Sequence, residues 1–485
     1  MTEVQYYVKP APRPRNLDAD LAIARTAPAS NVVSTAVEAA MAVGAKVVTV
    51  VADTESALIS ATAEQRLQIE ATAGLTLYPN YEYELAAYLQ PYMDSLATAS
   101  ANAALAGPHE YVFVVEGPKS QPISGARVEV WLVGKPEPAV AVTDSTGTAK
   151  FELCEKQAHS VDVYPRANYW CGRFEKPNTS ATPRKLPLEE ISLPFKDSLA
   201  HFFPVRDEKH GAGVKVAIID TGIATHADLP VPVVQRTILD GKILDGADDN
   251  GTDHGTHVAG IVAGQGKGIR GVAPGVSLMA YRVFAEGSRT AKSIDITTAI
   301  DLAVIDGADI INLSLGFEGS DDSIKTSILN AISSGVLVVA ATGNDGKDKL
   351  RFPALMPEVC SVGAVGLSEA FAATSTHRAI GVRQMNDDSE FVAAFSNYSS
   401  TGVDSAGPGV AVISTTYADG YQALSGTSMA APVIAGVAAV LLSRDPQVAG
   451  LSGDERVKAL QKLLYNEGRT LKLDSKYVGS GVPAL

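Results

Sequence analysis

The second half of the chain contains short runs of mostly Val and Ile that alternate with segments of helical character. Helical segments such as His254–Gly264 and Ser293–Asp306 lie between several of these runs. Strands this apolar are buried on both faces, and helical crossovers join parallel strands. Residues 205–450 are therefore predicted to form an α/β domain with a mostly parallel sheet and helices on both faces. The predicted strands are Val214–Ile219, Leu278–Val283, Asp309–Leu313, Val336–Ala341 and Val359–Val365.

Two polar residues stand where this architecture concentrates chemistry, beyond the carboxyl ends of the strands. Asp220 follows a predicted strand, where its carboxylate can orient an imidazole. His254 opens a predicted helix, and the helix dipole there disfavours the imidazolium and keeps the ring neutral, as a general base requires. Asp220 alone could equally be a residue that caps a turn.

A third polar residue, Ser428, begins an apolar helix within the sequence LSGTSMAAP. Its small neighbours allow a substrate to approach the backbone, and its N–H points to where an oxyanion would form. A serine at a helix start is often only a cap. Taken together, however, Asp220, His254 and Ser428 supply the orienting acid, the base and the nucleophile of a serine hydrolase.

Three sequence blocks that contain these residues resemble the signature blocks of the subtilase family of serine endopeptidases. The resemblance covers about residues 205–445, and the order Asp, His, Ser is that of subtilisin. It implies a subtilisin-like fold, a protein or peptide substrate and no cofactor. It also implies Asp220 as orienting acid, His254 as base and then acid, and Ser428 as nucleophile. The blocks are VAIIDTGIATHADL (Val216–Leu229), HGTHVAG (His254–Gly260) and GTSMAAP (Gly426–Pro432).

The same resemblance extends to the residues that would hold a substrate. The segment AATGNDG resembles the family's oxyanion segment, which implies that the Asn344 side chain donates to the tetrahedral oxyanion. Phe352-Pro353 falls where the family often has a cis peptide bond. The substrate would bind as an added strand. The residues implied to contact it are Ser314, Leu315 and Gly316 on one edge, Gly287, Ser288 and Arg289 on the opposite edge, and Gly343 beside Asn344.

No metal site is predicted. His254 and His257 have the i,i+3 spacing of a possible metal pair, but no Glu follows His254 as in the HExxH zinc motif. His257 is expected to pack or hydrogen-bond in the helix. The loop Gly264–Val272 is short and has no carboxylate or Asn, so the calcium site that many family members have there is not expected.

Two features depart from the family near the expected groove. Ala372–Phe391 has the polar composition of an inserted surface loop, which could lie near the groove. Counting back from Phe352-Pro353 places Arg351 at the floor of the pocket for the residue before the scissile bond. A guanidinium there predicts an acidic side chain at that position. The alternatives for Arg351 are solvent, or a pair with Asp345 or Asp348.

Two further domains are predicted before residue 205. Residues 18–85 have the element order β-α-β-β-α-β of a ferredoxin-like α+β domain, with a first strand at Leu21–Ala24. Ala57–Leu85 resembles part of the family's inhibitory propeptide, which implies that Tyr81–Leu85 enters the groove as an intramolecular inhibitor. Residues 108–165 have short alternating runs between turns, which predict a small antiparallel β-sandwich. Residues 168–204 are interpreted as an irregular linker.

Composition restricts partners and location. A net charge of −14 argues against nucleic-acid and anionic-membrane partners. The first 20 residues lack the apolar run of a secretory signal, so a cytoplasmic protein is predicted, with signal-free export as the alternative. The three cysteines do not make a disulfide scaffold, although Cys154 and Cys171 could pair.

One function from another class fits the same sequence. The chain could be a peptide-binding scaffold that its own N-terminal domain holds closed. The complete set of Asp220, His254, Ser428 and Asn344 favours an active endopeptidase instead.

Overall fold

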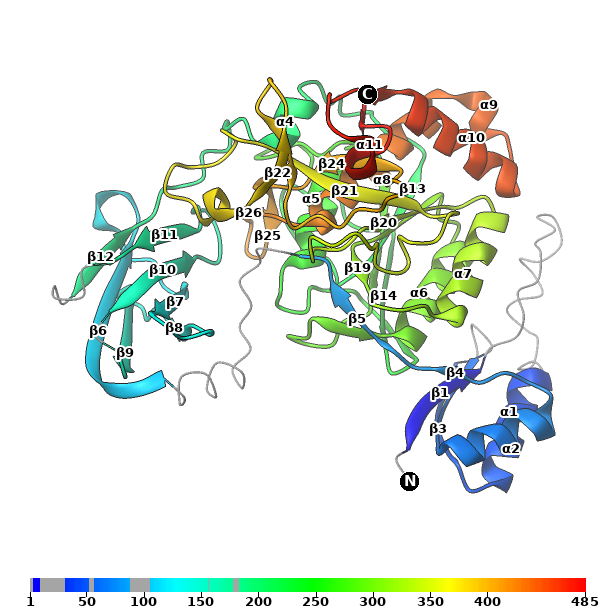
Figure 1. Ribbon diagram of the computed structural model, residues 1–485. Coiled ribbons are helices and arrows are strands. Elements are labelled where there is room, and N and C mark those ends of the chain that lie inside the picture. Colours follow the sequence, from blue (N-terminus) through cyan, green and yellow to red (C-terminus); the bar gives the residue numbers. More distant parts are fainter. Residues whose placement is uncertain (1–2, 9–30, 52–55, 88–104, 156, 178–182) are drawn as a thin grey trace.

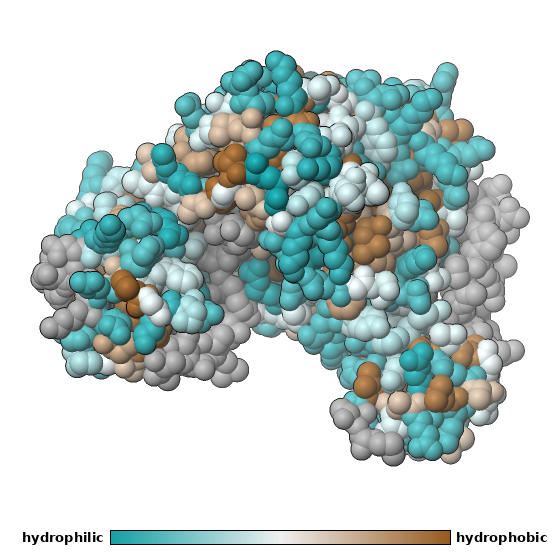
Figure 2. All heavy atoms as spheres, in the orientation of Figure 1, coloured by the Kyte–Doolittle hydropathy of each residue, from teal (hydrophilic) through white to brown (hydrophobic). Residues whose placement is uncertain are grey.

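The computed structural model describes residues 3–8, 31–51, 56–87, 105–155, 157–177 and 183–485. Figure 1 shows a large central α/β part, with an N-terminal α+β part and a β-sandwich attached at different places on its surface. The face in Figure 2 is mostly hydrophilic, as the high net charge suggests.

The central part is built on a ten-stranded mixed sheet with the order β15-β14-β16-β13-β18-β20-β21-β23-β22, and β24 pairs with β21. The neighbours from β14 to β21 are parallel, whereas β15, β22 and β23 pair antiparallel. The predicted α/β architecture is therefore confirmed, with antiparallel edges. The strands are β13 (Lys215–Asp220), β14 (Val234–Leu239), β15 (Lys242–Asp245), β16 (Ser277–Arg282), β18 (Ile310–Leu313), β20 (Leu337–Ala341), β21 (Cys360–Leu367), β22 (Val382–Met385), β23 (Glu390–Ala393) and β24 (Ser405–Pro408).

Helices pack in pairs against this sheet. Helix α5 (His254–Ala263) packs on α8 (Thr427–Arg444), and α6 (Ser293–Ile305) packs on α7 (Asp322–Ser333). Helix α8 is long and apolar enough to cross a membrane, but 83% of it is buried inside the protein. It is the central helix of the core, and Ser428 lies in its first turn.

The central part continues beyond the predicted boundary at residue 450. The backbone N–H of Ala406 in β24 donates to the carbonyl of Gly481, 3.0 Å away. The C-terminal segment is thus tied to the main sheet and completes the domain. Its elements are α9 (Pro446–Ala449), α10 (Gly453–Asn466), β27 (Gly468–Arg469), α11 (Ser475–Val478) and β28 (Val482–Pro483).

The N-terminal part has a four-stranded antiparallel sheet in the order β2-β3-β1-β4. Its first strand, Val4–Val8, lies inside the sheet between β3 and β4. A domain that began at residue 18 would lack this strand, so the predicted boundary is wrong. The strand expected at Leu21–Ala24 lies outside the described residues. The other elements are α1 (Asn31–Ala42), β2 (Lys46–Val51), β3 (Ser56–Ala61), α2 (Ala63–Ala73) and β4 (Tyr78–Pro79).

This small sheet is covered on both faces. Successive strand residues point to opposite faces, so Tyr6 and Val8 pack into the core with α1 and α2. Tyr7 points the other way and packs with Ile294 of α6, where its hydroxyl hydrogen-bonds Thr297 at 3.0 Å. Apolar burial therefore holds the N-terminal part on the central one.

The β-sandwich is larger than predicted and is not wholly antiparallel. Its two sheets have the orders β11-β10-β7-β8 and β12-β6-β9, and β12 pairs parallel with β6. The strands β11 and β12 lie within residues 168–204, which are therefore not an irregular linker throughout. Cys154 and Cys171 are free thiols. The strands are β6 (Ala106–Glu116), β7 (Arg127–Leu132), β8 (Ala139–Val142), β9 (Thr148–Leu153), β10 (Ala158–Tyr164), β11 (Gly172–Glu175) and β12 (Arg184–Pro187).

The predicted insertion Ala372–Phe391 joins the sandwich to the central domain. The N–H of Thr376 donates to the carbonyl of Cys171 at 3.0 Å, and the N–H of Arg173 donates to the carbonyl of Thr374 at 3.0 Å. Thr376 is buried, and the segment also contributes β22 to the main sheet. The expectation of a surface loop is therefore wrong for this part of the segment.

Candidate active site and substrate groove

Asp220 and His254 meet because β13 ends where α5 begins. The His254 Nδ1 lies 2.7 Å from the Asp220 Oδ1, and both side chains are buried. The N–H of Thr221 donates to the same oxygen at 2.7 Å, which fixes the carboxylate. Close approach of the two segments requires a glycine at position 255, since a Cβ there would lie 2.2 Å from the carbonyl oxygen of Gly222.

Ser428 and Ser314 form two reciprocal hydrogen bonds. Pro432 lies one turn after Ser428 in α8 and has no N–H, so the Ser428 carbonyl lacks its helical donor. The hydroxyl of Ser314 donates to that carbonyl at 2.9 Å. The Ser428 hydroxyl in turn donates to the Ser314 carbonyl at 3.0 Å.

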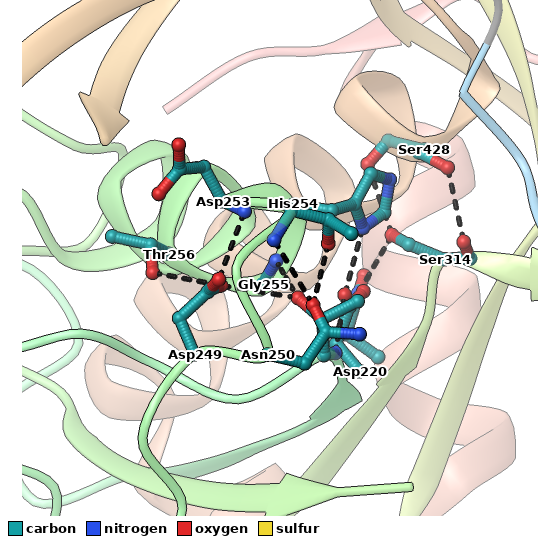
Figure 3. Close-up of polar contacts among 12 residues, drawn as sticks. Asp220, Asp249, Asn250, Asp253, His254, Gly255, Thr256, Ser314 and Ser428 are labelled. Atoms are coloured by element: carbon teal, nitrogen blue, oxygen red, sulfur yellow. Dashed lines mark hydrogen bonds and ion pairs between the residues drawn. The ribbon is translucent and has the colours of Figure 1, made fainter. Parts of the chain in front are cut away.

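His254 Nε2 is buried and has no hydrogen-bond partner among the described residues. Figure 3 shows Ser428 beside the imidazole of His254, with Asp220 on the other side of the ring. A rotation of the Ser428 side chain away from Ser314 would direct its hydroxyl at this nitrogen. Asp220, His254 and Ser428 thus lie together, although the Ser428 hydroxyl donates to the Ser314 carbonyl and not to His254.

Two donors converge on a single backbone carbonyl next to Ser428. The Asn344 amide nitrogen and the Ser428 backbone N–H both donate to the carbonyl oxygen of Ala86, the latter at 3.1 Å. The Asn344 Oδ1 accepts from the backbone N–H of Thr427 at 2.9 Å and from its hydroxyl at 3.0 Å. Thr427, which the sequence interpretation did not single out, therefore orients the Asn344 amide. The sequence feature that could have indicated this role is the position of Thr427 between Gly426 and Ser428 in the signature block.

The chain's own segment β5 (Glu82–Leu85) lies between β19 (Leu315–Gly316) and β17 (Thr290–Lys292) as an antiparallel strand. Figure 1 shows it running from the N-terminal part across the central domain. The Ala86 N–H continues the pairing by donating to the Ser314 carbonyl at 3.1 Å. The chain's own segment thus pairs with Ser314, Leu315 and Gly316, the residues that the resemblance implied for one edge of the groove.

On the opposite side, β5 is contacted from Arg289 onward, the last residue of the predicted edge Gly287–Arg289. The carbonyl of Arg289 accepts from the N–H of Leu85 at 3.2 Å, and β17 continues this edge. The Ser288 hydroxyl instead donates to the carbonyl oxygen of Thr290 at 2.9 Å. Gly343 lies beside Asn344, and its N–H donates to the Thr427 hydroxyl at 3.2 Å.

Tyr83 of β5 is the most deeply inserted side chain of this segment. It is fully buried, its ring centroid lies 5.3 Å from that of Phe317, and its hydroxyl donates to the Asp321 carboxylate at 3.2 Å. Tyr81 stacks on the same phenylalanine, with the ring centroids 4.9 Å apart. The groove therefore has an aromatic pocket with a buried acceptor at its end.

The residues considered for metal binding have other partners. Nε2 of His257 lies 3.1 Å from the Val412 carbonyl and 3.0 Å from the Gln422 carbonyl, and burial lowers the pKa of this histidine to about 3. Asp228 accepts the backbone N–H groups of Lys267, Gly268 and Ile269 at 2.7–3.0 Å. The short loop thus satisfies this carboxylate with N–H donors, whereas a hard cation needs oxygen ligands. The described residues contain no group of three or more His, Cys, Asp or Glu that could hold a metal.

The Arg351 guanidinium is not free at the floor of a pocket, because two carboxylates bind it. It binds the carboxylate of Asp345, which was one of the alternatives, and that of Glu84 in β5. The neighbouring Phe352-Pro353 peptide bond is cis.

Sequence comparisons agree with this geometry. Residues 211–481 match the subtilase family, Peptidase_S8. The chain belongs to the subtilase family. Subtilisin DY of Bacillus licheniformis is 38% identical over 280 residues, which are 56% of this chain and 89% of that protein. M-protease of Shouchella clausii is 37% identical over 239 residues, 49% of this chain and 56% of that protein.

The thermophilic serine proteinase of Bacillus sp. (strain AK1) is 38% identical over 249 residues, 49% of this chain and 54% of that protein. The chain thus spans just over half the length of two of these relatives, and most of subtilisin DY. As a subtilase it is a serine endopeptidase. The cytoplasmic placement predicted above is contradicted, because the subtilisins among its relatives are secreted, extracellular proteases.

Proposed function

We propose that this subtilase hydrolyses peptide bonds with Ser428 as nucleophile, His254 as base and then acid, and Asp220 as the group that orients His254. One observation carries the proposal. The Ala86 carbonyl accepts from both the Asn344 amide and the Ser428 N–H. Two donors on one peptide carbonyl, next to a serine hydroxyl and a buried imidazole, form the arrangement that stabilises a tetrahedral oxyanion.

The proposed reaction follows from the positions of these atoms. Ser428 Oγ attacks the peptide carbonyl carbon and its proton passes to Nε2 of His254, while Asp220 holds Nδ1. The oxyanion accepts from Asn344 and the Ser428 N–H. The peptide C–N bond breaks as His254 protonates the leaving amine, which leaves an ester on Ser428. A water molecule gives a proton to His254 and attacks the ester, and the ester C–O bond breaks as His254 returns that proton to Ser428 Oγ, which releases the carboxylic acid product.

Covalent labelling separates the enzyme from a peptide-binding scaffold. A serine-reactive phosphonate should label the purified chain at one site, because only a serine beside a general base is nucleophilic enough. Mass spectrometry should place the label on Ser428, and Ser428→Ala should not be labelled. Replacement of Ser443, a serine of the same helix, by alanine is the control and should leave labelling unchanged. Absence of labelling both in the unmodified chain and after removal of residues 1–86 would favour the scaffold.

We further propose that residues 4–86 inhibit the enzyme and that the bond Ala86–Ala87 is the one presented for cleavage. The proposal is supported by the antiparallel pairing of β5 with both groove edges. It is also supported by the caps that the same segment gives to helix α6. The N–H of Ser293 donates to the Tyr81 carbonyl at 2.8 Å, and the N–H of Ile294 donates to the Asn80 side chain at 3.0 Å.

Inhibition in trans tests this proposal. A peptide of residues 1–86 should inhibit the processed enzyme at micromolar concentration, whereas residues 18–86 should inhibit far less because they lack the strand β1. Tyr83→Ala in the longer peptide should weaken inhibition about a hundredfold, since truncation of a fully buried aromatic costs about 3 kcal/mol. Leu67→Ala, at a residue that is 67% exposed, is the matched control and should inhibit normally. Equal inhibition by the Tyr83 and unmodified peptides would contradict binding through the groove.

A further inference from the structure

Arg351 holds two carboxylates at the rim of the groove. Its Nε and Nη2 donate to the two oxygens of Asp345 at 2.8 Å each, and its Nη1 donates to Oε2 of Glu84 at 2.7 Å. The bidentate pair fixes the plane of the guanidinium, because both groups are planar and match each other's geometry. Nη1 is therefore held facing the groove.

The groove itself determines which residue of a bound chain meets Nη1. The Ala86 carbonyl lies at Asn344 and Ser428, so Ala86 is the residue before the bond to be cut. Glu84 is two residues further upstream, and it pairs directly with Gly316 of β19. Since strand pairing fixes this register, the third residue before the cleaved bond always lies beside Arg351.

Asp345 keeps its orientation and charge. It accepts from the Asn397 amide at 3.0 Å, and the Arg351 guanidinium holds the pKa of the Asp345 carboxyl below its ordinary value. The Arg351 side chain is 18% exposed and that of Glu84 is 63% exposed. The contact with Glu84 is thus an ion pair at the surface, with a prearranged cation on the enzyme side.

The methylene groups of Arg351 have a second consequence. A Cβ at Gly316 would lie 3.0 Å from Cβ of Arg351, and a Cβ at Gly343 would lie 2.8 Å from Cγ of Arg351. The stem therefore fills the space between these two segments. Ala86 is bound by the same two segments, through Ser314 on one and Asn344 on the other. A longer side chain in place of the Ala86 methyl would extend toward that stem.

We propose that Arg351 determines substrate choice at two positions, and that the preferred substrates are peptides with a carboxylate three residues before the cleaved bond and a small residue directly before it. The proposal rests on the proposed function, because it assigns subsites of the same catalytic groove. It replaces the expectation of an acidic residue directly before the bond, since the side chain bound by Arg351 belongs to Glu84.

Peptide competition tests it in the full-length chain as purified. The parent peptide is YEYELAAYLQ, residues 81–90 of the chain. One set of variants has Glu, Gln or Lys at the position of Glu84, and a second set has Ala, Leu or Phe at the position of Ala86. The two peptides of each pair compete for the same enzyme molecules in one reaction. Their ratio of kcat/KM therefore does not depend on the fraction of molecules whose groove is free of β5. Glu should exceed Gln about fivefold, the upper range for a partly exposed ion pair. This ratio should fall toward one in 1 M salt.

Two variants separate the charge of Arg351 from its stem. Arg351→Gln keeps most of the stem, so it should lose the Glu preference and retain the Ala preference. Arg351→Ala should lose both, and Leu should gain at least about tenfold relative to Ala, because removal of the stem opens the pocket. Lys347→Gln is the control, since Lys347 is a nearby cation that pairs with Glu318 instead, and it should change neither ratio.

The outcomes are distinct. If Ser428→Ala abolishes hydrolysis but the unmodified chain cuts the Glu and Gln peptides at equal rates, the inference about Arg351 is wrong and the proposed function stands. A Glu preference that survives in Arg351→Gln would also overturn it. Peptides cut equally by the unmodified chain and by Ser428→Ala would instead overturn the proposed function.

Discussion

Replacing Ser428 with alanine is expected to lower kcat on casein by about 10⁶, a loss as large as any expected for a single side chain of this protein. In the proposed reaction the hydroxyl supplies the covalent step, and neither His254 nor Asn344 can replace it. The magnitude is that measured for the corresponding unit in subtilisin, a relative of this chain. Folding is checked by the melting temperature, which should change little because the hydroxyl makes one hydrogen bond, to the Ser314 carbonyl.

The triad should also behave as one unit. His254→Ala should cost about as much as Ser428→Ala, and the double variant should cost no more than either single one, because each change removes the same step. Asp220→Asn should cost about 10⁴, since an amide in place of the carboxylate favours the wrong tautomer of His254. Multiplicative losses in the double variant would mean that the two residues act in separate steps.

Asn344→Ala is expected to lower kcat by about 10²–10³ with little change in KM. The Asn344 amide already touches the Ala86 carbonyl, but its bond strengthens as the carbonyl oxygen becomes an anion, so the loss falls on the transition state. The magnitude is that known for one oxyanion donor in subtilisin. Steady-state kinetics on a single peptide give kcat and KM separately.

Thr427 offers the matched comparison for Asn344. Thr427→Val keeps the shape and the backbone N–H but removes the hydroxyl that donates to Asn344 Oδ1, so the amide remains held by one of its two donors. The loss in kcat should therefore be smaller than for Asn344→Ala. A change confined to KM in Asn344→Ala would place the side chain in ground-state binding and contradict its role at the oxyanion.

Local sequence was sufficient for the central α/β architecture and for the positions of Asp220, His254 and Ser428. Each of these residues lies at the end of a buried strand or in the first turn of a helix. Apolar periodicity locates such boundaries because it depends on neighbouring residues only. Asn344, which follows the apolar strand β20 (Leu337–Ala341) by three residues, was instead indicated by the resemblance of its segment to the family's oxyanion segment.

Pairing between distant segments was beyond local sequence. Strand Val4–Val8 owes its place inside the N-terminal sheet to partners about 50 or more residues away, and β12 pairs with a strand about 70 residues earlier. The strand β17 likewise pairs with β5, which is about 200 residues earlier. Hydrophobic pattern indicates that a strand exists, but its partner is set by the packing of the whole chain.

Side-chain direction was decided by tertiary contacts as well. The sequence placed Arg351 near the groove, yet its guanidinium turns to Asp345 and Glu84 because those carboxylates offer charge-assisted hydrogen bonds. The Ser428 hydroxyl points to the Ser314 carbonyl while the Ala86 carbonyl accepts from the Ser428 N–H. Sequence alone thus determined which chemical groups this subtilase carries and at which element ends. The folded structure decided what each group touches, because those contacts join residues that are distant along the chain.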